Sequence, residues 1–124
     1  MRRDILAWQW SQYGEGHQSR RNLVLHAVTA PLFMLGTSAL LTSPLTGVGA
    51  AVGGAALMFV ALVAQGRGHR EEAARPAPFL GPADFVVRFL AEQWVTFPRF
   101  VLSGSFARAW RAAGANASGD AGAR

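Results

Sequence analysis

Residues 23–41 read LVLHAVTAPLFMLGTSALL and residues 45–64 read LTGVGAAVGGAALMFVALVA, and these two stretches decide the fold. Neither contains a formally charged residue. A transmembrane helix needs about 20 mainly apolar residues at a rise of about 1.5 Å each, so both stretches are long enough to cross a bilayer. The residues between them, Thr-Ser-Pro at 42–44, are typical of a tight turn. The sequence therefore predicts a transmembrane hairpin.

Arginines flank both outer ends of this hairpin, whereas its turn is uncharged. They are Arg2, Arg3, Arg20, Arg21, Arg67, Arg70 and Arg75. Basic residues favour the cytoplasmic side of a membrane, so we expect an integral membrane protein with both hairpin ends in the cytoplasm. Charges and two tryptophans precede the first leg, and the second leg follows almost at once. We therefore interpret the first leg as a retained helix and not as a signal peptide.

The segments on either side of the hairpin predict shorter helices. Residues 4–13 carry tryptophan and tyrosine rings, which prefer the headgroup level, so we expect an interfacial helix there. Residues 85–102 are apolar, but Arg88, Glu92 and Arg99 would form one stripe on a helix, which either lies in the interface or turns inward to a bundle. We predict an all-α fold, a polytopic membrane helical bundle with a central transmembrane hairpin and flanking interfacial or re-entrant helices.

The chain of 124 residues has room for one domain. Pro98 should kink or end the third apolar segment, because proline lacks a backbone N–H. From residue 112 onward Ala, Gly, Asn, Ser and Asp dominate. We therefore predict a single membrane helical domain over 1–111 and a disordered tail over 112–124.

Composition narrows the function classes. Cysteine is absent, so a disulfide framework or thiolate metal site is excluded, and any metal must bind nitrogen and oxygen. The net charge of +5 comes from arginines scattered singly or in pairs, so we expect a membrane surface as partner and no nucleic acid. Phosphate-binding loops, nucleophile elbows and zincin helices have no counterpart in the sequence. The function classes that remain are metal-dependent chemistry and a protein without catalytic activity.

Three histidines, His17, His26 and His69, are the candidate metal ligands, since the hairpin brings them to one membrane face. If the chain turns at Pro44, His26 lies opposite residue 62 of the second leg. His69 then lies about 10 Å beyond that point if the second leg is a straight helix. Convergence then requires a bend, which nearby glycines permit. Taken one at a time, His17 is typical of an exposed loop and His69 of a helix end. His26 is an ionisable residue within the first leg, which indicates function. Together they favour one site for Fe(II), Zn or Mn.

Polar residues near the histidines complete the predicted site. We predict catalytic roles for Asn22 and Glu72, with capping of the first leg as the alternative for Asn22. Gln65 and Glu92 either bind substrate or pair with other polar groups inside the bundle. Arg75 suits a substrate carboxylate, although arginine at a membrane surface also meets lipid phosphate.

A competing hypothesis is a non-catalytic small membrane protein that binds lipid or a partner helix. Gly49 and Gly53 have the small-xxx-small spacing that lets another helix approach closely, which also suits a homo-oligomer. A general glycine bias of the composition explains the spacing equally well. Metal content would separate this hypothesis from the enzyme.

Several spaced motifs carry a resemblance to a known family. They are Tyr13-Gly14-x2-His17-x4-Asn22-x3-His26, the apolar hairpin, Gln65-x2-Gly68-His69 and the Pro76-Ala77 pair. This combination, from about Trp8 to Trp110, resembles the membrane family of fungal 2-hydroxy fatty acid dioxygenases and their bacterial relatives.

The resemblance implies an Fe(II)-dependent enzyme that uses O2. Its substrate would be a long-chain 2-hydroxy fatty acid, shortened by one carbon in α-oxidation. The essential histidines of the family correspond to His17, His26 and His69, and a bacterial member would reside in the inner membrane.

Overall fold

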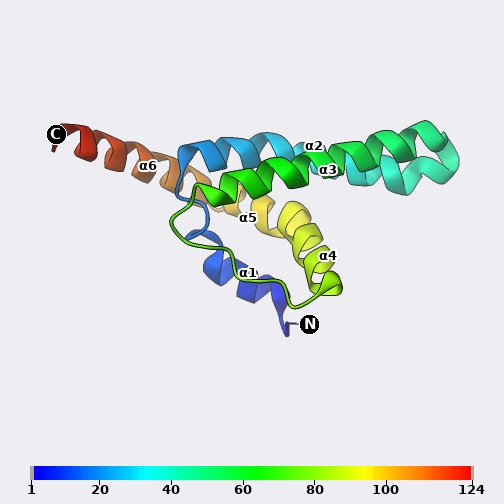
Figure 1. Ribbon diagram of the computed structural model, residues 1–124, viewed down its shortest axis with the longest axis horizontal. Coiled ribbons are helices and arrows are strands. Elements are labelled where there is room, and N and C mark those ends of the chain that lie inside the picture. Colours follow the sequence, from blue (N-terminus) through cyan, green and yellow to red (C-terminus); the bar gives the residue numbers. More distant parts are fainter. Residues whose placement is uncertain (1, 124) are drawn as a thin grey trace.

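The computed structural model describes residues 2–123 and is built from helices (Figure 1). In chain order these are α1 (Ile5–Tyr13), α2 (Arg20–Thr46), α3 (Val48–Arg70), α4 (Pro82–Ala91), a π-helical turn η1 (Glu92–Thr96), α5 (Phe97–Leu102) and α6 (Ser105–Gly122). The all-α class and the long hairpin, formed by α2 and α3, are confirmed. α1 and α4 lie to one side of this hairpin, and α6 extends past its open end.

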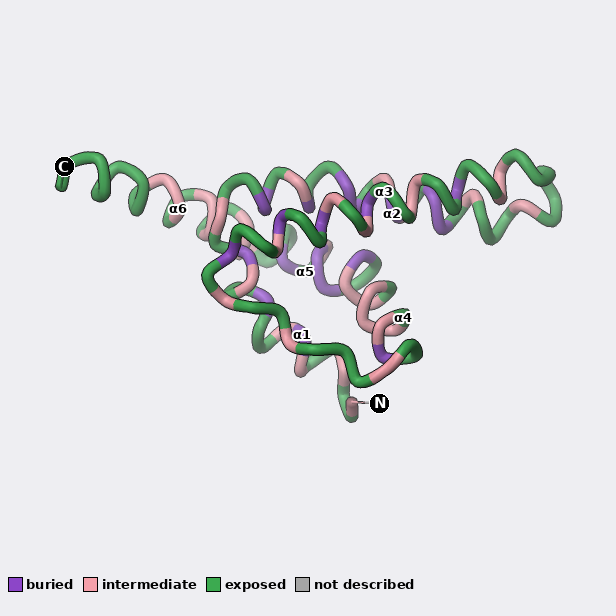
Figure 2. The backbone as a smooth tube through the Cα atoms, in the orientation of Figure 1, coloured by how far each residue is buried: buried purple, intermediate pink, exposed green. Residues whose placement is uncertain are grey.

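Within residues 2–123, α2 and α3 are the two helices that are long and apolar enough to cross a membrane. Only 39% of the most apolar window of α2 and 17% of that of α3 is buried inside the protein. The core helix of a soluble protein would be mostly buried, whereas these helices expose apolar side chains along most of their length. Figure 2 shows that exposed and half-buried residues dominate the half of the hairpin nearest its turn.

The hairpin turns at Gly47, so the expected turn at residues 42–44 is wrong. α2 continues through Pro44, and the Leu40 carbonyl, which would bond the N–H that proline lacks, accepts instead from Ser43 Oγ at 2.7 Å. Gly47 has φ 106°, a conformation that glycine adopts without a steric penalty. A turn at Gly47 places His26 opposite residue 68. α3 then reaches His69 as one continuous helix, and the expected bend is unnecessary.

Two glycines let the legs of the hairpin come into close contact. A Cβ atom built on Gly36 would lie 2.7 Å from the Gly54 carbonyl oxygen, and one built on Gly54 would lie 2.5 Å from the Gly36 carbonyl oxygen. Only glycine fits such a backbone contact. By contrast, no described atom lies within 4 Å of a Cβ built on Gly49 or Gly53, so that pair faces away from α2.

The core lies at the open end of the hairpin, where the shorter helices meet α2. Its buried apolar residues are Tyr13, Leu23, Ala30, Phe97 and Phe100. The expected third apolar segment is one continuous helical stretch made of α4, η1 and α5, and Pro98 is the second residue of α5, directly after the π-helical turn. The helix changes from π to α at Phe97, next to Pro98, but it does not end there and continues to Leu102. This segment is not a candidate span among residues 2–123.

The structure differs from the disordered tail expected over 112–124, because α6 is helical through Gly122. Alanine, the best helix former, recurs throughout this segment. Its anchor is Arg20, whose guanidinium lies over the Trp110 ring and contacts Gly114. α6 thus crosses the expected boundary at residue 111, and the division into a domain over 1–111 and a tail over 112–124 stays a prediction.

Candidate metal centre

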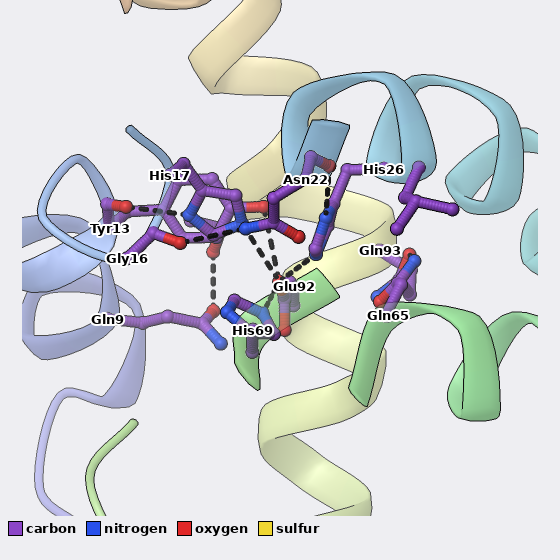
Figure 3. Close-up of polar contacts among 12 residues, drawn as sticks. Gln9, Tyr13, Gly16, His17, Asn22, His26, Gln65, His69, Glu92 and Gln93 are labelled. Carbon is purple, nitrogen blue, oxygen red and sulfur yellow. Dashed lines mark hydrogen bonds and ion pairs between the residues drawn. The ribbon is translucent and has the colours of Figure 1, made fainter. Parts of the chain in front are cut away.

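The three histidines and Glu92 converge on one point at the open end of the hairpin (Figure 3). The Nε2 atoms of His26, His17 and His69 lie 3.2, 3.8 and 4.0 Å from Glu92 Oε1. The ring centroids of His17, His26 and His69 are 4.5 to 5.0 Å apart in pairs. The predicted convergence is therefore confirmed, and the carboxylate in the group is Glu92.

Four different parts of the chain supply these side chains. His17 comes from the link between α1 and α2, and His26 from the second turn of α2. His69 stands in the last turn of α3, opposite His26 because the hairpin turns at Gly47. Glu92 begins η1, which packs against α1 and α2.

Backbone contacts orient the imidazoles of His17 and His26 so that Nε2 faces the centre. His17 Nδ1 lies 2.7 Å from the Tyr13 carbonyl oxygen, and His26 Nδ1 lies 3.0 Å from the Asn22 carbonyl oxygen. The His69 ring lies beside Gly16, since its Nδ1 is 4.0 Å from a Cβ built on that glycine. When Nδ1 donates to a carbonyl, Nε2 carries the free lone pair, which is the arrangement of most metal-binding histidines.

A metal ion fits the group. His17 Nε2 and His26 Nε2 are buried and have no hydrogen-bond partner among the described residues. Buried polar atoms without partners are rare and costly, so their position requires an explanation. Ligand atoms about 2 Å from one ion lie about 3 to 4 Å from one another, which matches the Nε2 to Oε1 distances. Three nitrogens and one oxygen suit Fe(II), Zn or Mn.

The local electrostatics favour the protonation states that bind a metal. Burial, together with the neighbouring His26, lowers the pKa of His17 from 6.5 to about 3, which outweighs the opposing effect of Glu92. Burial alone would raise the pKa of Glu92, but the close contact with His26 and the other nearby histidines lower it to about 2. A neutral imidazole and an ionised carboxylate are the metal-ligating forms.

Tyr13 joins α1 to the centre. Its hydroxyl donates to Glu92 Oε1 at 3.2 Å, and its ring stacks on His17 with centroids 3.9 Å apart. Burial and the Glu92 carboxylate raise the pKa of Tyr13 well above 10.0, so the phenol keeps its proton. Tyr13 belongs to the sequence motif that contains His17, but no role in the site was expected for it. Its spacing of four residues from His17 was the available signal.

The two predicted catalytic residues lie next to the centre and bond to each other. Asn22 Nδ2 donates to Glu72 Oε1 at 2.9 Å and to the Gly16 carbonyl at 3.0 Å. Glu72 also accepts the backbone N–H groups of Gln18 and Ser19. This network ties the end of α3 to the link that carries His17. The expected cap of α2 is formed by Ser19 and not by Asn22. Their catalytic roles stay a prediction.

The predicted substrate residues lie in three different environments. Glu92 is in the centre itself. Gln65 is buried and bonds to Gln93 and Thr29, both missed by the sequence analysis. Arg75 is exposed and lines a cavity. Glu92 and Gln93 are adjacent polar residues within an apolar segment, and burying a polar side chain without a partner costs free energy. This pattern could have identified Gln93 as a bonded residue inside the bundle.

A cavity of about 120 Å³ reaches the centre between α1, the segment 74–77 and α4. His17, His69, Glu92 and Tyr13 line its inner end, and Arg75 lines it as well. His69 is the most exposed of the three histidines, at 22%. The cavity therefore adjoins the centre on the side where His69 is partly exposed.

Comparisons with protein-family models, with curated proteins and with solved structures find no match. A function for the chain must therefore be argued from its own site.

Proposed function

We propose that the chain is an Fe(II)-dependent dioxygenase of the bacterial inner membrane that acts on long-chain 2-hydroxy fatty acids. The observation that carries this proposal is the convergence of three imidazole Nε2 atoms, two of them buried, on one carboxylate. Histidines with a single carboxylate and open positions are typical of non-haem iron oxygenases. The motif resemblance supplies the substrate class.

The position of the group suits a lipid substrate. His26 and Gly47 are separated by about 30 Å of helix at 1.5 Å per residue, which is the thickness of the hydrocarbon core. With the hairpin across the bilayer, the centre lies at one interface. The flanking arginines put that interface on the cytoplasmic side. An acid headgroup could reach the centre there while its chain stays among apolar surfaces.

Each part of the chain has a defined task in this proposal. His17, His26, His69 and Glu92 hold the metal, and Tyr13 holds Glu92 through its hydroxyl. Bound Fe(II) would supply the activation of O2 next to the carboxylate and 2-hydroxyl end of the substrate.

Other residues serve access and water exclusion. Arg75, at the cavity, suits the approach of an anionic headgroup. Burial of His17 and His26 keeps bulk water from the inner side of the centre. The net reaction converts the hydroxy acid and O2 into the acid one carbon shorter, CO2 and water, so that four electrons pass from the acid to O2.

The test combines metal content with turnover. Protein purified in mild detergent without chelator should contain about one metal ion per chain and, with Fe(II) and O2, should shorten a long-chain 2-hydroxy acid by one carbon. His17→Ala, His26→Ala, His69→Ala and Glu92→Gln should each weaken metal binding and abolish turnover. The matched control is Glu71→Gln, because Glu71 is an exposed carboxylate paired with Arg21 and not with the centre.

Two results would contradict the proposal. Wild-type protein that binds no divalent metal would refute the metal centre. Turnover that persists with a strong iron chelator would refute the metal mechanism. A metal-free protein would favour the non-catalytic alternative, for which the open Gly49 and Gly53 face provides a surface for a partner helix.

A further inference from the structure

A reciprocal pair of glutamines lies beside the metal centre. Gln65 Nε2 donates to Gln93 Oε1 at 2.9 Å, and Gln93 Nε2 donates to Gln65 Oε1 at 2.7 Å. Gln65 Nε2 also donates to Thr29 Oγ1 at 2.9 Å. The side chains of Gln65 and Gln93 are 1% and 0% exposed. The pair therefore joins the C-terminal part of α3 to η1 through two direct bonds that water does not reach.

The π-helical turn explains why this joint affects the centre. Adjacent residues of an α-helix point about 100° apart, and the wider π-helical turn reduces this angle, so Glu92 and Gln93 are closer in direction in η1 than in a regular helix. In η1 the Phe97 N–H bonds back to the Glu92 carbonyl, which widens the turn. Glu92 then reaches the histidines while Gln93 reaches Gln65 (Figure 3). The register of η1 on the hairpin fixes both side chains together.

We propose that the Gln65–Gln93 pair is a positioning device that locks the register of η1 on α3 and so holds Glu92 as the metal-binding carboxylate. The inference rests on the metal centre of the proposed function. It gives Gln65 a role other than substrate binding. The polar atoms of Gln65 are already bonded to Gln93 and Thr29, and its side chain is buried.

The Gln65–Gln93 pair affects the position of one of the four metal ligands, Glu92. The histidines come from α2, α3 and the α1–α2 link, and His17 and His26 are oriented by backbone contacts that do not involve η1. Loss of the pair should therefore leave a three-histidine site with a misplaced carboxylate. The resulting defect should match that of Glu92→Gln.

The experiment is a double-mutant cycle read out by anaerobic Co(II) titration in detergent, with the dissociation constant and the visible absorption of bound Co(II) as measurements. Gln93→Leu should weaken Co(II) binding roughly 10- to 100-fold, as loss of outer-sphere support does at metal sites. Its spectrum should shift toward that of Glu92→Gln. In the Glu92→Gln background, Gln93→Leu should cause no further loss.

A second variant separates positioning from stability. Gln93→Leu leaves the Gln65 amide buried without its partner and should destabilise the fold, whereas Gln65→Leu/Gln93→Leu replaces both partners by apolar groups and should recover thermal stability. It should not recover Co(II) affinity, because two leucines do not fix a register. The control Phe33→Leu changes a buried residue elsewhere on α2 and should lower stability with affinity unchanged.

The outcomes are distinct. Additive losses for Gln93→Leu and Glu92→Gln, or recovery of both stability and affinity in the double leucine variant, would overturn the inference. Wild-type protein that fails to bind Co(II) would instead overturn the metal centre and the inference with it. Coupled losses together with recovered stability alone would establish the positioning role.

Discussion

Replacing Gly68 with alanine should loosen the metal centre without touching a ligand. A Cβ built on Gly68 would overlap Asn22 Oδ1. Asn22 is fully buried, and its amide holds the Gly16 carbonyl and the Glu72 carboxylate. Any shift of Asn22 therefore disturbs the link that carries His17.

The magnitude follows from three terms. Inserting a methyl group into a packed contact costs about 1 to 3 kcal/mol. Breaking one of the Asn22 bonds in a buried site adds about 1 to 3 kcal/mol. Alanine regains about 1 kcal/mol because it favours helix more than glycine does. We expect Gly68→Ala to destabilise the protein by about 1 to 5 kcal/mol and to weaken metal binding.

Gly66→Ala is the matched control, since it lies two residues earlier on the same helix and has no described atom within 4 Å of a built Cβ. It should be neutral or stabilise by up to about 1 kcal/mol. Denaturant or thermal unfolding in detergent, together with Co(II) titration, compares the two variants. If Gly68→Ala were as stable as Gly66→Ala and bound Co(II) like wild type, the packing argument would be refuted.

Three further predictions concern the hairpin and the metal. Gly54→Ala should lower the unfolding temperature sharply because its Cβ would meet the Gly36 backbone, whereas Gly53→Ala should leave it unchanged; equal effects would contradict the close contact. Reporter fusions at Gly47 and after Arg75 should report opposite sides of the membrane, and release by alkaline carbonate would argue against integral insertion. Removal of a metal present at 1,000 times its dissociation constant should lower stability by about 4 kcal/mol, and thermal unfolding with and without chelator checks it.

The hairpin could be predicted from sequence because two long uncharged stretches leave few alternatives. The position of its turn could not, because Pro44 and Gly47 are both turn residues. The structure favours Gly47 since Ser43 satisfies the carbonyl that Pro44 leaves free, a contact that residue type alone does not reveal. That shift of three residues decided whether His26 and His69 could meet on straight helices.

The histidines could be predicted as one group because the hairpin puts them on one side. Their carboxylate could not be assigned, since Glu71 and Glu72 are near His69 in sequence whereas Glu92 arrives through the π-helical turn. Periodicity analysis assumes a regular helix, and η1 breaks that assumption at the residue concerned. The stripe containing Glu92 indicated an inward polar face as one of two alternatives.

Because the turn consists of the single residue Gly47, the register of the two hairpin legs is fixed. A longer loop would absorb insertions, but a residue added within α3 must rotate everything beyond it by about 100° and advance it by about 1.5 Å. His69 would then leave the centre, while His26 stayed in place. Changes in length that preserve the site must therefore occur in both legs together, or outside them. Because the turn is distant from the histidines, the depth of the centre and the span of the protein are set by the same count of residues.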